Sequence, residues 1–378
     1  MQSDAGRRVA PPSSTRVPAA VIADTIANSG LAPDTAAPAS DAVFQARMLD
    51  GVSRTFALTI PQLPADLHPV VANAYLLCRI IDTIEDETAL SAATKREFSA
   101  RFVRAVLGEE PAEHFAAALF PLLSDTTLAA ERELIRETPR VLAITHGFNP
   151  AQRDALATCV RVMGEGMVRF QENRNARGLD DLAAMDRYCY HVAGVVGEML
   201  TRLFCEHSPA IAQHRDRLMP LSVSFGQGLQ MTNILKDIWA DLERGACWLP
   251  RTVFGQAGFD LKGLAPNQYN AAFGRGLTTL VAIAHGHLRN AVRYTLLIPS
   301  DETGIRNFCL WAIGMAVLTL RKIHRHPDFA GGDEVKISRR SVRSIVIASR
   351  LAAGHDRAIR MLFAAASAGI PMLQTEMN

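Results

Sequence analysis

Residues 75–87 read Tyr75-Leu-Leu-Cys-Arg-Ile-Ile-Asp82-Thr-Ile-Glu-Asp86-Glu87, an apolar segment that ends in acidic side chains. Asp82 and Asp86 are four residues apart, so in an α-helix they share one face, about one turn apart. Two carboxylates placed in this way repel each other unless a cation lies between them. Mg²⁺ prefers a few carboxylates together with the phosphates of a substrate. The segment therefore predicts an apolar helix whose C-terminal end carries a metal-binding pair.

The same spacing returns far downstream, where Asp237 and Asp241 follow a second apolar segment and Asn233 lies one turn before them. One such pair is weak evidence, because acidic pairs on solvated helix ends are common. Two pairs that face each other across a helical bundle would place metal on opposing walls of a cavity. That arrangement suits a diphosphate, whose leaving-group charge the metals neutralise as the carbon–oxygen bond breaks.

The rest of the chain is also helical in pattern, with apolar residues at helical spacing and good helix formers between them. We find no convincing alternating strand and no internal repeat. Prolines and glycines separate the candidate helices, which we expect near 42–58, 67–86, 94–107, 112–123, 129–145, 151–174, 182–206, 209–240, 268–296, 303–325 and 339–366. The pattern predicts an all-α, single-domain bundle of ten or so helices.

Composition sets the domain limits and the compartment. Residues 1–40 are rich in Pro, Ala, Ser and Thr and are expected to form a disordered tail. Residues 41–350 are expected to form the catalytic domain, and residues 351–378 a C-terminal helix and tail.

The cysteines form no CxxC pair and stand in apolar segments, so we expect reduced, buried thiols in a cytoplasmic protein; they are Cys78, Cys159, Cys189, Cys205, Cys247 and Cys309.

The net charge excludes some partners. The chain of 378 residues carries 40 basic and 38 acidic side chains, a formal net charge of +2, which argues against a nucleic-acid binder.

No run of 18 or more uncharged apolar residues occurs, so no transmembrane helix is expected. The last segment, Leu351 to Met377, allows an amphipathic surface helix and hence peripheral contact with a membrane.

Several segments together resemble the squalene and phytoene synthases, head-to-head condensing enzymes with the all-α isoprenoid synthase fold and a central cavity. The resemblance runs from about residue 41 to about residue 345. It is carried by both aspartate motifs, by Ser53-Arg54-Thr55-Phe56, by Met-Gly-Glu-Gly-Met at 163–167 and by Tyr-Cys-Tyr-His-Val-Ala-Gly-Val-Val-Gly at 188–197. Asn307-Phe308-Cys309 and Val335-Lys336-Ile337 are similar to squalene synthases rather than to phytoene synthases.

The resemblance implies a role for each matching residue. Metal ligands are expected at Asp82, Asp86, Asp237, Asp241 and Asn233. Catalytic roles are expected for Tyr188, Arg79 and Tyr75. Substrate contacts are expected from Ser53, Arg54, Phe56, Val192, Gln230, Lys236, Arg244 and Phe308, and nucleotide contacts from Thr55, Arg79, Asn233 and Lys336. Gly194 and Gly197 are expected to leave room for a long substrate chain.

The implied reaction is Mg²⁺-dependent condensation of two farnesyl diphosphates to presqualene diphosphate, followed by NADPH-dependent reduction to squalene. The alternatives are an enzyme that stops at presqualene diphosphate, or one that makes phytoene, dehydrosqualene or another terpenoid. A helical scaffold protein without catalysis is the alternative of a different class, and it predicts damaged acidic motifs. All four aspartates are present.

The chain also departs from the family pattern. Ala240 stands where a glutamate is usual, Lys236 stands where an arginine is common, and Leu310-Trp-Ala follows Cys309 in place of Ala-Ile-Pro. The C-terminal membrane anchor of the eukaryotic enzymes is missing from this sequence. Together these features suit a soluble, bacterial-type relative.

Overall fold

The computed structural model describes residues 40–53, 55–172 and 176–373. Arg54, a predicted diphosphate ligand, lies outside the described residues, and so does the predicted tail as far as residue 39. One compact unit spans Asp41–Asn378, and every helix described below belongs to it. The predicted boundary at residue 350 falls inside one of these helices, α17.

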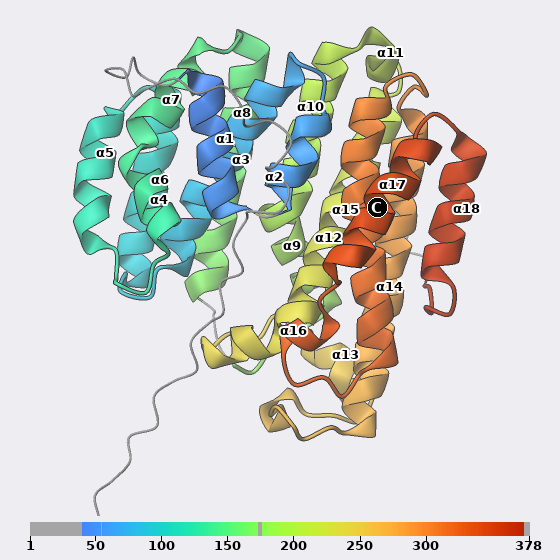
Figure 1. The fold of residues 1–378 in the computed structure, drawn as a ribbon. Helices are drawn as coiled ribbons and strands as arrows, with labels where there is room; N and C mark the ends of the chain where they lie inside the picture. The colour runs from blue at the N-terminus through green and yellow to red at the C-terminus, as the bar shows by residue number, and fades with distance from the viewer. Residues whose placement is uncertain (1–39, 54, 173–175, 374–378) are drawn as a thin grey trace, which may run out of the picture. The chain divides into compact units, whose positions relative to one another are not determined.

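The first half of the unit gathers around α3 (Leu67–Asp86), on the left of Figure 1. α8 (Pro150–Glu172) and α4 (Ala92–Leu107) pack against it and against each other. The remaining elements of this half are α1 (Asp41–Val52), α2 (Phe56–Thr59), η1 (Ile60–Gln62), α5 (Ala112–Leu119), η2 (Phe120–Leu122), α6 (Ala129–Arg136) and α7 (Thr138–Gly147).

The second half is built on α12 (Arg215–Glu243), which packs along α14 (Ala271–Leu297) and α10 (Val195–His207). α15 (Thr303–Arg325) completes this layer, and Figure 1 shows α17 and α18 outside it. The shorter elements are α9 (Leu182–Cys189), η3 (Tyr190–Gly194), α11 (Pro209–Ala212), α13 (Arg251–Gln256), η4 (Leu261–Gly263), α16 (Gly332–Val335), α17 (Arg339–Ala352) and α18 (Asp356–Ser367).

The all-α prediction is confirmed, and the structure corrects several helix limits. Six predicted helices, 42–58, 112–123, 129–145, 182–206, 209–240 and 339–366, are each divided in the structure. The divisions have local causes: Pro139 stands in the first turn of α7, and the chain turns at Gly354 between α17 and α18. α13 and α16 were not predicted, because helices of six and four residues leave too little periodicity to detect.

Glycines allow α12 to lie against the η3–α10 segment backbone to backbone. A Cβ on Gly197 would be 2.3 Å from the Ser222 carbonyl oxygen, and one on Gly226 would be 2.2 Å from the Ala193 carbonyl oxygen. A Cβ on Gly194 would be 3.3 Å from Val223 Cγ1. The prediction that Gly194 and Gly197 leave room for a substrate is therefore wrong, since α12 occupies that space.

The apolar side chains form two buried clusters, one centred on α3, α4 and α8 and the other on α12, α14 and α15. Val192 and Phe225 are half-buried and pack against both clusters. All six cysteines are free, and five of them are buried, which confirms the expectation of unpaired thiols. α15 is long and apolar enough to cross a membrane, but 67% of its apolar window is buried in the bundle, as in a core helix.

Candidate active site

The first aspartate pair stands at the C-terminal end of α3, and Glu87 holds that end in place. Glu87 is buried and leaves the helix with an extended backbone. Its carboxylate accepts hydrogen bonds from the Ala89 N–H at 2.8 Å, from the Ser124 N–H at 2.9 Å and from the Thr127 hydroxyl. The last turn of α3, with Asp82 and Asp86, is therefore tied to the loop before α6.

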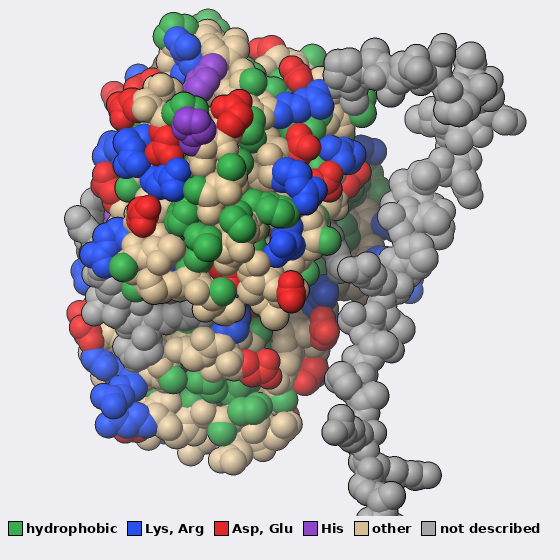
Figure 2. All heavy atoms as spheres, turned by 90° about the vertical axis from the view of Figure 1, so that its left-hand side faces the viewer, with side chains coloured by type: hydrophobic (Ala, Val, Ile, Leu, Met, Phe, Trp, Pro, Cys, Tyr) green, Lys and Arg blue, Asp and Glu red, His purple; other side chains and the backbone are tan. Residues whose placement is uncertain are grey.

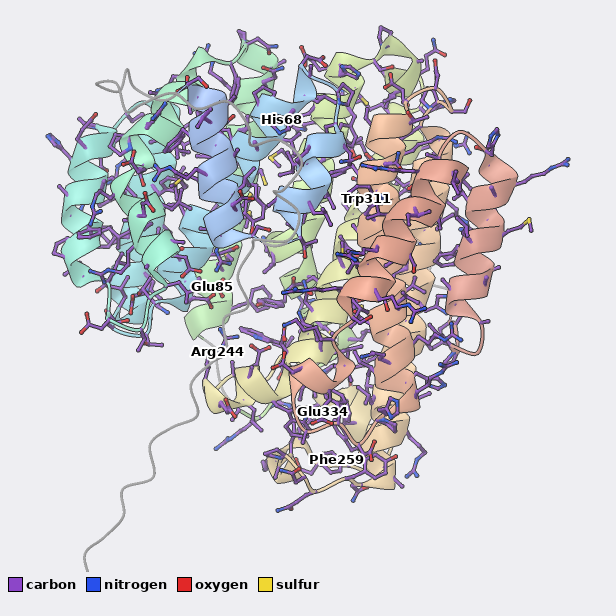
Figure 3. The ribbon with its side chains drawn as sticks, in the orientation of Figure 1. His68, Glu85, Arg244, Phe259, Trp311 and Glu334 are labelled. Atoms are coloured by element: carbon purple, nitrogen blue, oxygen red, sulfur yellow. The ribbon has the colours of Figure 1, made fainter. Side chains whose placement is uncertain are left out.

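The second aspartate pair stands at the C-terminal end of α12, and Arg244 links it to the first. Arg244 Nη2 donates to Asp241 Oδ1 at 2.5 Å, and Arg244 Nη1 lies 3.7 Å from Asp86 Oδ1. Figure 3 labels Arg244 and, in the last turn of α3, Glu85. Lys236 Nζ lies 3.1 Å from Asp237 Oδ2. The two motifs, about 150 residues apart in the sequence, thus meet in one cluster.

The protonation of these aspartates reflects the shortage of positive charge around them. Burial, the largest effect, raises the pKa of Asp82 to about 7; Arg79 opposes the shift and the negative charge of Asp86 adds to it. Burial also raises the pKa of Asp241, against Arg244, and the carboxylates of Asp237 and Asp86 raise it further. Crowded carboxylates of this kind are stabilised by an added cation.

This donor set fits Mg²⁺ held jointly with a substrate. The available ligands are carboxylate oxygens, the type that Mg²⁺ prefers. Within the described ranges, no three carboxylate, imidazole or thiol groups converge on one point as a ready-made cage. Mg²⁺ usually keeps several waters and binds through one or two carboxylates plus substrate phosphates.

Arg79 and Tyr75 lie further along the same face of α3. Arg79 forms an ion pair with Glu131 of α6 and lies 3.9 Å from Asp82 Oδ2. The Tyr75 hydroxyl donates to the Val52 carbonyl at 3.4 Å, and its ring lies 5.0 Å from the ring of Phe56. Burial raises the pKa of Tyr75, so its phenol stays protonated near neutral pH.

The short helix α2 borders this face. The Ser53 hydroxyl accepts a hydrogen bond from the Phe56 N–H, the first of α2, at 2.9 Å. Ser53 also lowers the pKa of Tyr75 slightly through a hydrogen bond to its phenol. Thr55 is exposed and Phe56 is half-buried. The structure therefore brings Ser53, Phe56 and Tyr75 together beside the end of α1.

Tyr188 lies at the end of α9, buried and stacked face to face on Trp248, with ring centroids 4.1 Å apart and planes at 7°. Phe170 meets its ring edge-on at 5.2 Å. Burial raises the pKa of Tyr188 well above its usual value, and the charges of Glu85, Asp241 and Asp86 add to the shift. The phenol therefore stays neutral and lies within the electrostatic reach of both aspartate motifs.

A backbone bridge places Trp248 against Tyr188. The Leu179 N–H donates to the Leu249 carbonyl at 2.9 Å, and the Arg251 N–H donates to the Leu179 carbonyl at 2.8 Å. The chain then passes from α9 into the π-helical turn η3, Tyr190–Gly194. A π turn inside an α-helix often marks a functional site, because it shifts the following side chains around the helix axis. Here it presents Val192 between the two apolar clusters.

The remaining predicted residues are distributed along α12, α15 and α16. Gln230 is half-buried and Asn233 is exposed one turn before Asp237. Phe308 is buried, with its ring edge-on to Phe204 at 6.3 Å, so it lies in the core around the site. Lys336 is exposed and lies 3.2 Å from Asp333.

Lys336 follows α16, which rests on the second motif. A Cβ on Gly332 would be 3.1 Å from the Lys236 carbonyl oxygen and 3.3 Å from Asp237 Oδ1. The Trp239 indole N–H donates to the Phe329 carbonyl at 2.7 Å, which fastens the preceding loop to α12. The basic segment around Lys336 thus borders the second aspartate pair.

Sequence reasoning missed Glu131, Trp248, Glu87 and Asp186. Asp186 stands two residues before Tyr188, and burial raises its pKa to about 6, with Arg187 opposing and Asp181 adding to the shift. One of its carboxylate oxygens is buried without a hydrogen-bond partner in the described part of the chain. Glu87 is the last residue of the first aspartate motif, and Asp186 lies two residues before the 188–197 segment, where an acidic residue inside an apolar helix was the available signal.

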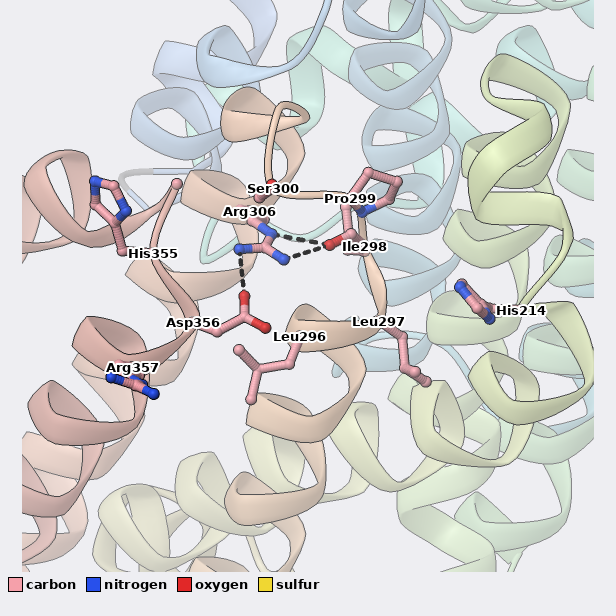
Figure 4. A pocket seen from close by; sticks show the side chains of 11 residues that line it. His214, Leu296, Leu297, Ile298, Pro299, Ser300, Arg306, His355, Asp356 and Arg357 are labelled. Carbon is pink, nitrogen blue, oxygen red and sulfur yellow. Dashed lines mark hydrogen bonds and ion pairs between the residues drawn. The ribbon is translucent and has the colours of Figure 1, made fainter.

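A separate pocket of about 590 Å³ lies between the α14–α15 and α17–α18 turns (Figure 4). Arg306 is buried there and donates to the Ile298 carbonyl at 2.9 and 2.6 Å, to the Ala353 carbonyl at 2.9 Å and to Asp356 Oδ1 at 2.9 Å. None of the residues lining this pocket belongs to either aspartate motif. Arg306 therefore fastens two turns of the bundle together.

Comparisons with known proteins agree with this geometry. Residues 49–341 match the family model described as squalene/phytoene synthase. The squalene synthase of Yarrowia lipolytica is 29% identical over 74% of this chain and 61% of its own length. The squalene synthase ERG9 of Candida albicans is 27% identical over 81% of this chain and 67% of its own.

The fold has a counterpart among solved structures. The structure of TcSQS in complex with the ligand BPH1237 superposes with a TM-score of 0.70 at 23% identity, and the match covers 89% of this chain and 94% of that one. The chain spans about three fifths to two thirds of the length of the two curated relatives above.

Proposed function

The chain belongs to the squalene/phytoene synthase family, and from this premise we propose that it condenses two farnesyl diphosphates to presqualene diphosphate and reduces that product to squalene. The observation that carries the proposal is the cluster in which Arg244 joins Asp86 of α3 to Asp241 of α12. Two acidic helix ends that meet in this way suit a substrate whose leaving group is a diphosphate.

Asp82, Asp86, Asp237 and Asp241 are the residues that would hold Mg²⁺, with Asn233 on the same face of α12. When bound, Mg²⁺ supplies the positive charge that stabilises a departing diphosphate. Arg244 contributes a guanidinium already inside the cluster, and Lys236 contributes an ammonium beside Asp237. Arg79, paired with Glu131, borders the same end of α3.

In the first step, the carbon–oxygen bond of the donor breaks and diphosphate leaves with the bonding electrons. The double bond of the acceptor forms the new carbon–carbon bond, and loss of a proton closes a cyclopropane ring. Tyr188 lies beside this chemistry as a neutral phenol whose ring is stacked on Trp248. Aromatic faces stabilise a nearby cation. The phenol of Tyr188 stays neutral because its pKa is raised. A hydroxyl both accepts and donates, so it would accept the departing proton while passing its own to the released diphosphate.

The surrounding apolar side chains would enclose the prenyl chains and exclude water, which would otherwise quench the cation. Phe56, Tyr75, Val192 and Phe225 are half-buried and border the apolar clusters rather than filling them. Leu200 and Val196 on α10 have the same character. We assign these side chains to the prenyl-binding wall, with Phe308 behind them.

The second step requires a hydride, which NADPH would supply. Lys336 is exposed, and its segment borders Asp237 through Gly332, so it can contact an anionic nucleotide next to the diphosphate site. Thr55, Asn233 and Arg79 are the other residues proposed for this role. Contact of the enzyme with a membrane surface would give its water-insoluble product an outlet.

The test is an incubation of the purified protein with farnesyl diphosphate and Mg²⁺, with and without NADPH, followed by phosphatase treatment and mass spectrometry. We expect presqualene alcohol without NADPH and squalene with it. Asp82→Asn and Asp237→Asn should each reduce turnover by about a hundredfold or more, since each removes a carboxylate that stabilises the leaving group.

Other products would change the assignment in defined ways. Presqualene alcohol both with and without NADPH would mean that the enzyme does not carry out the reductive step and that Lys336 has no role in it. Turnover of geranylgeranyl diphosphate alone would identify a phytoene synthase. No turnover of either substrate would refute head-to-head condensation and point to Ala240 in the altered second motif.

A further inference from the structure

Large apolar side chains stand exposed on the outer helices α17 and α18. Leu351 is 76% exposed, Met361 72% and Ile347 62%, the three most exposed large apolar side chains among the described residues. Leu362 on α18 and Met372 and Leu373 after it are less exposed, at 39%, 42% and 48%. Large exposed apolar areas on a protein surface often mark a site of interaction with a protein or a membrane.

Positive charge accompanies this apolar area. Residues 336–373 contain seven Lys or Arg and one Asp, a formal net charge of +6, whereas the whole chain has +2. In the part of the chain that the structure describes, Arg343, Arg357 and Arg360 form no ion pair, so their charge is uncompensated. The rest of the molecule is therefore acidic overall, and the basic residues concentrate at one end of the fold.

The two helices present these side chains on their outer sides. α17 and α18 pack against α15 and against each other, and α18 also packs against α14 (Figure 1). Ile347 and Leu351 are one turn apart on the exposed side of α17, and Arg343 is one turn before them. On α18, Arg357 and Met361 are likewise one turn apart. We call these side chains, together with Arg360, the α17–α18 surface.

The face shown in Figure 2 differs from the α17–α18 surface in its charge. Figure 2 shows the side that is turned to the left in Figure 1, where Lys and Arg are interspersed with Asp and Glu. Interspersed charges of both signs are usual for a face exposed to water. The α17–α18 surface has one sign of charge and the largest exposed apolar side chains, which is the composition of an interfacial helix.

The α17–α18 surface is also held rigidly. The buried Arg306 joins the α17–α18 turn to the α14–α15 turn, and Ser338 caps the start of α17 by accepting from the Ser341 N–H at 3.1 Å. The Pro371 carbonyl lies 3.0 Å from His285 Nδ1, and the Leu373 N–H donates to the Ala282 carbonyl at 3.1 Å. The family match ends at residue 341, so nearly all of this surface lies beyond it.

We propose that the α17–α18 surface docks the protein on a bilayer that contains anionic phospholipids. Its apolar side chains enter the boundary between headgroups and acyl chains, and its arginines contact the lipid phosphates. The charge complementarity selects an anionic bilayer over a neutral one.

The test is co-sedimentation of the full chain with vesicles, which requires no catalytic activity and is therefore independent of the proposed reaction. Vesicles of phosphatidylcholine alone are compared with vesicles in which part of it is replaced by phosphatidylglycerol. We expect binding mainly to the anionic vesicles and weaker binding at high salt. Arg343→Glu with Arg360→Glu should reduce the partition coefficient by roughly 25-fold or more, from roughly fivefold per basic residue.

Matched variants test whether binding depends on the α17–α18 surface itself or only on the net charge and hydrophobicity of the whole protein. Arg217→Glu with Lys262→Glu makes the same change in net charge on exposed side chains elsewhere and should leave binding almost unchanged. Leu351→Ser with Met361→Ser should weaken binding, whereas Leu107→Ser with Leu128→Ser, also exposed, should not. Circular dichroism melts establish that each variant is folded.

Four outcomes would overturn the proposal. The first is equal binding to neutral and anionic vesicles, and the second is equal loss of binding in the control variants. The third is a dimer in sedimentation velocity that Leu351→Ser dissociates, without vesicle binding, which would assign this surface to self-association. Binding of free phosphatidylglycerol headgroup without bilayer binding would likewise refute the docking surface.

Discussion

Glu87 offers the most direct test of how α3 positions its aspartates. Burial by itself would raise the pKa of Glu87, but hydrogen bonds from Thr127, Ala89 and Ser124 prevail and lower it to about 2 from the usual 4.5. A difference of about 2.5 pH units corresponds to about 3 kcal/mol of stability at neutral pH. Because the folded-state pKa is depressed, this stability is present above pH 4.5 and is lost as the pH falls toward 2.

The variant Glu87→Gln removes the charge and sets an amide N–H₂ against donors that need an acceptor. We expect its free energy of unfolding in urea at pH 7 to be about 3 kcal/mol lower than that of the wild type. The difference should shrink by about 1 kcal/mol between pH 7 and pH 4, since the wild type then begins to lose its advantage. Glu109→Gln, an exposed carboxylate, is the matched control and should change little.

The result that would refute this reasoning is a difference below about 1 kcal/mol at pH 7, or one that grows on acidification. Either would mean that the carboxylate is not held by its three donors. A loss of Mg²⁺ affinity alongside the loss of stability would further show that the loop before α6 positions Asp86.

Three other substitutions test neighbouring parts of the fold. Gly197→Ala places a Cβ 2.3 Å from the Ser222 carbonyl oxygen and should cost about 2 kcal/mol or more in urea unfolding; an unchanged midpoint would contradict the backbone contact. Arg306→Met leaves buried carbonyls unpaired and should cost about 3–5 kcal/mol, and a cost near zero would show that water replaces the guanidinium. Arg244→Met should lower the melting temperature measured without metal and enlarge the rise in melting temperature that Mg²⁺ produces. Equal rises in the wild type and the variant would show that Arg244 does not affect metal binding.

The sequence was sufficient where local signals determine the structure. α3 begins and ends at the predicted residues, 67 and 86, because its apolar period is strong and polar residues mark both ends. The aspartate pairs were found for the same reason, since their spacing has meaning within a single helix. Neither conclusion needed knowledge of what the helix packs against.

Contacts between distant segments could not be read in this way. Arg79 was expected to have a catalytic role and to contact the nucleotide, but its ion-pair partner Glu131, 52 residues away on another helix, was not predicted. Trp248 reaches Tyr188 only because a backbone bridge joins Leu179 to the chain beside it. No periodicity or spacing encodes such pairings, which depend on the packed fold.

The π turn at 190–194 shows a subtler limit. Its residues keep helical dihedrals and apolar spacing, so the sequence predicted one unbroken helix over 182–206. At this turn α12 comes close, since a Cβ on Gly226 would lie 2.2 Å from the Ala193 carbonyl oxygen. Gly197 serves the same contact between helices, through the Ser222 carbonyl, and a contact with a distant helix cannot be read from local spacing.

The two acidic helix ends are anchored separately. Glu87 ties the end of α3 to the loop before α6, and the Trp239 indole ties α12 to the loop before α16. Arg244, whose side chain is about half exposed, links the two ends through Asp86 and Asp241. We propose that metal ions entering the cluster would compete with this guanidinium for the two carboxylates, while the two anchors hold the helix ends in place.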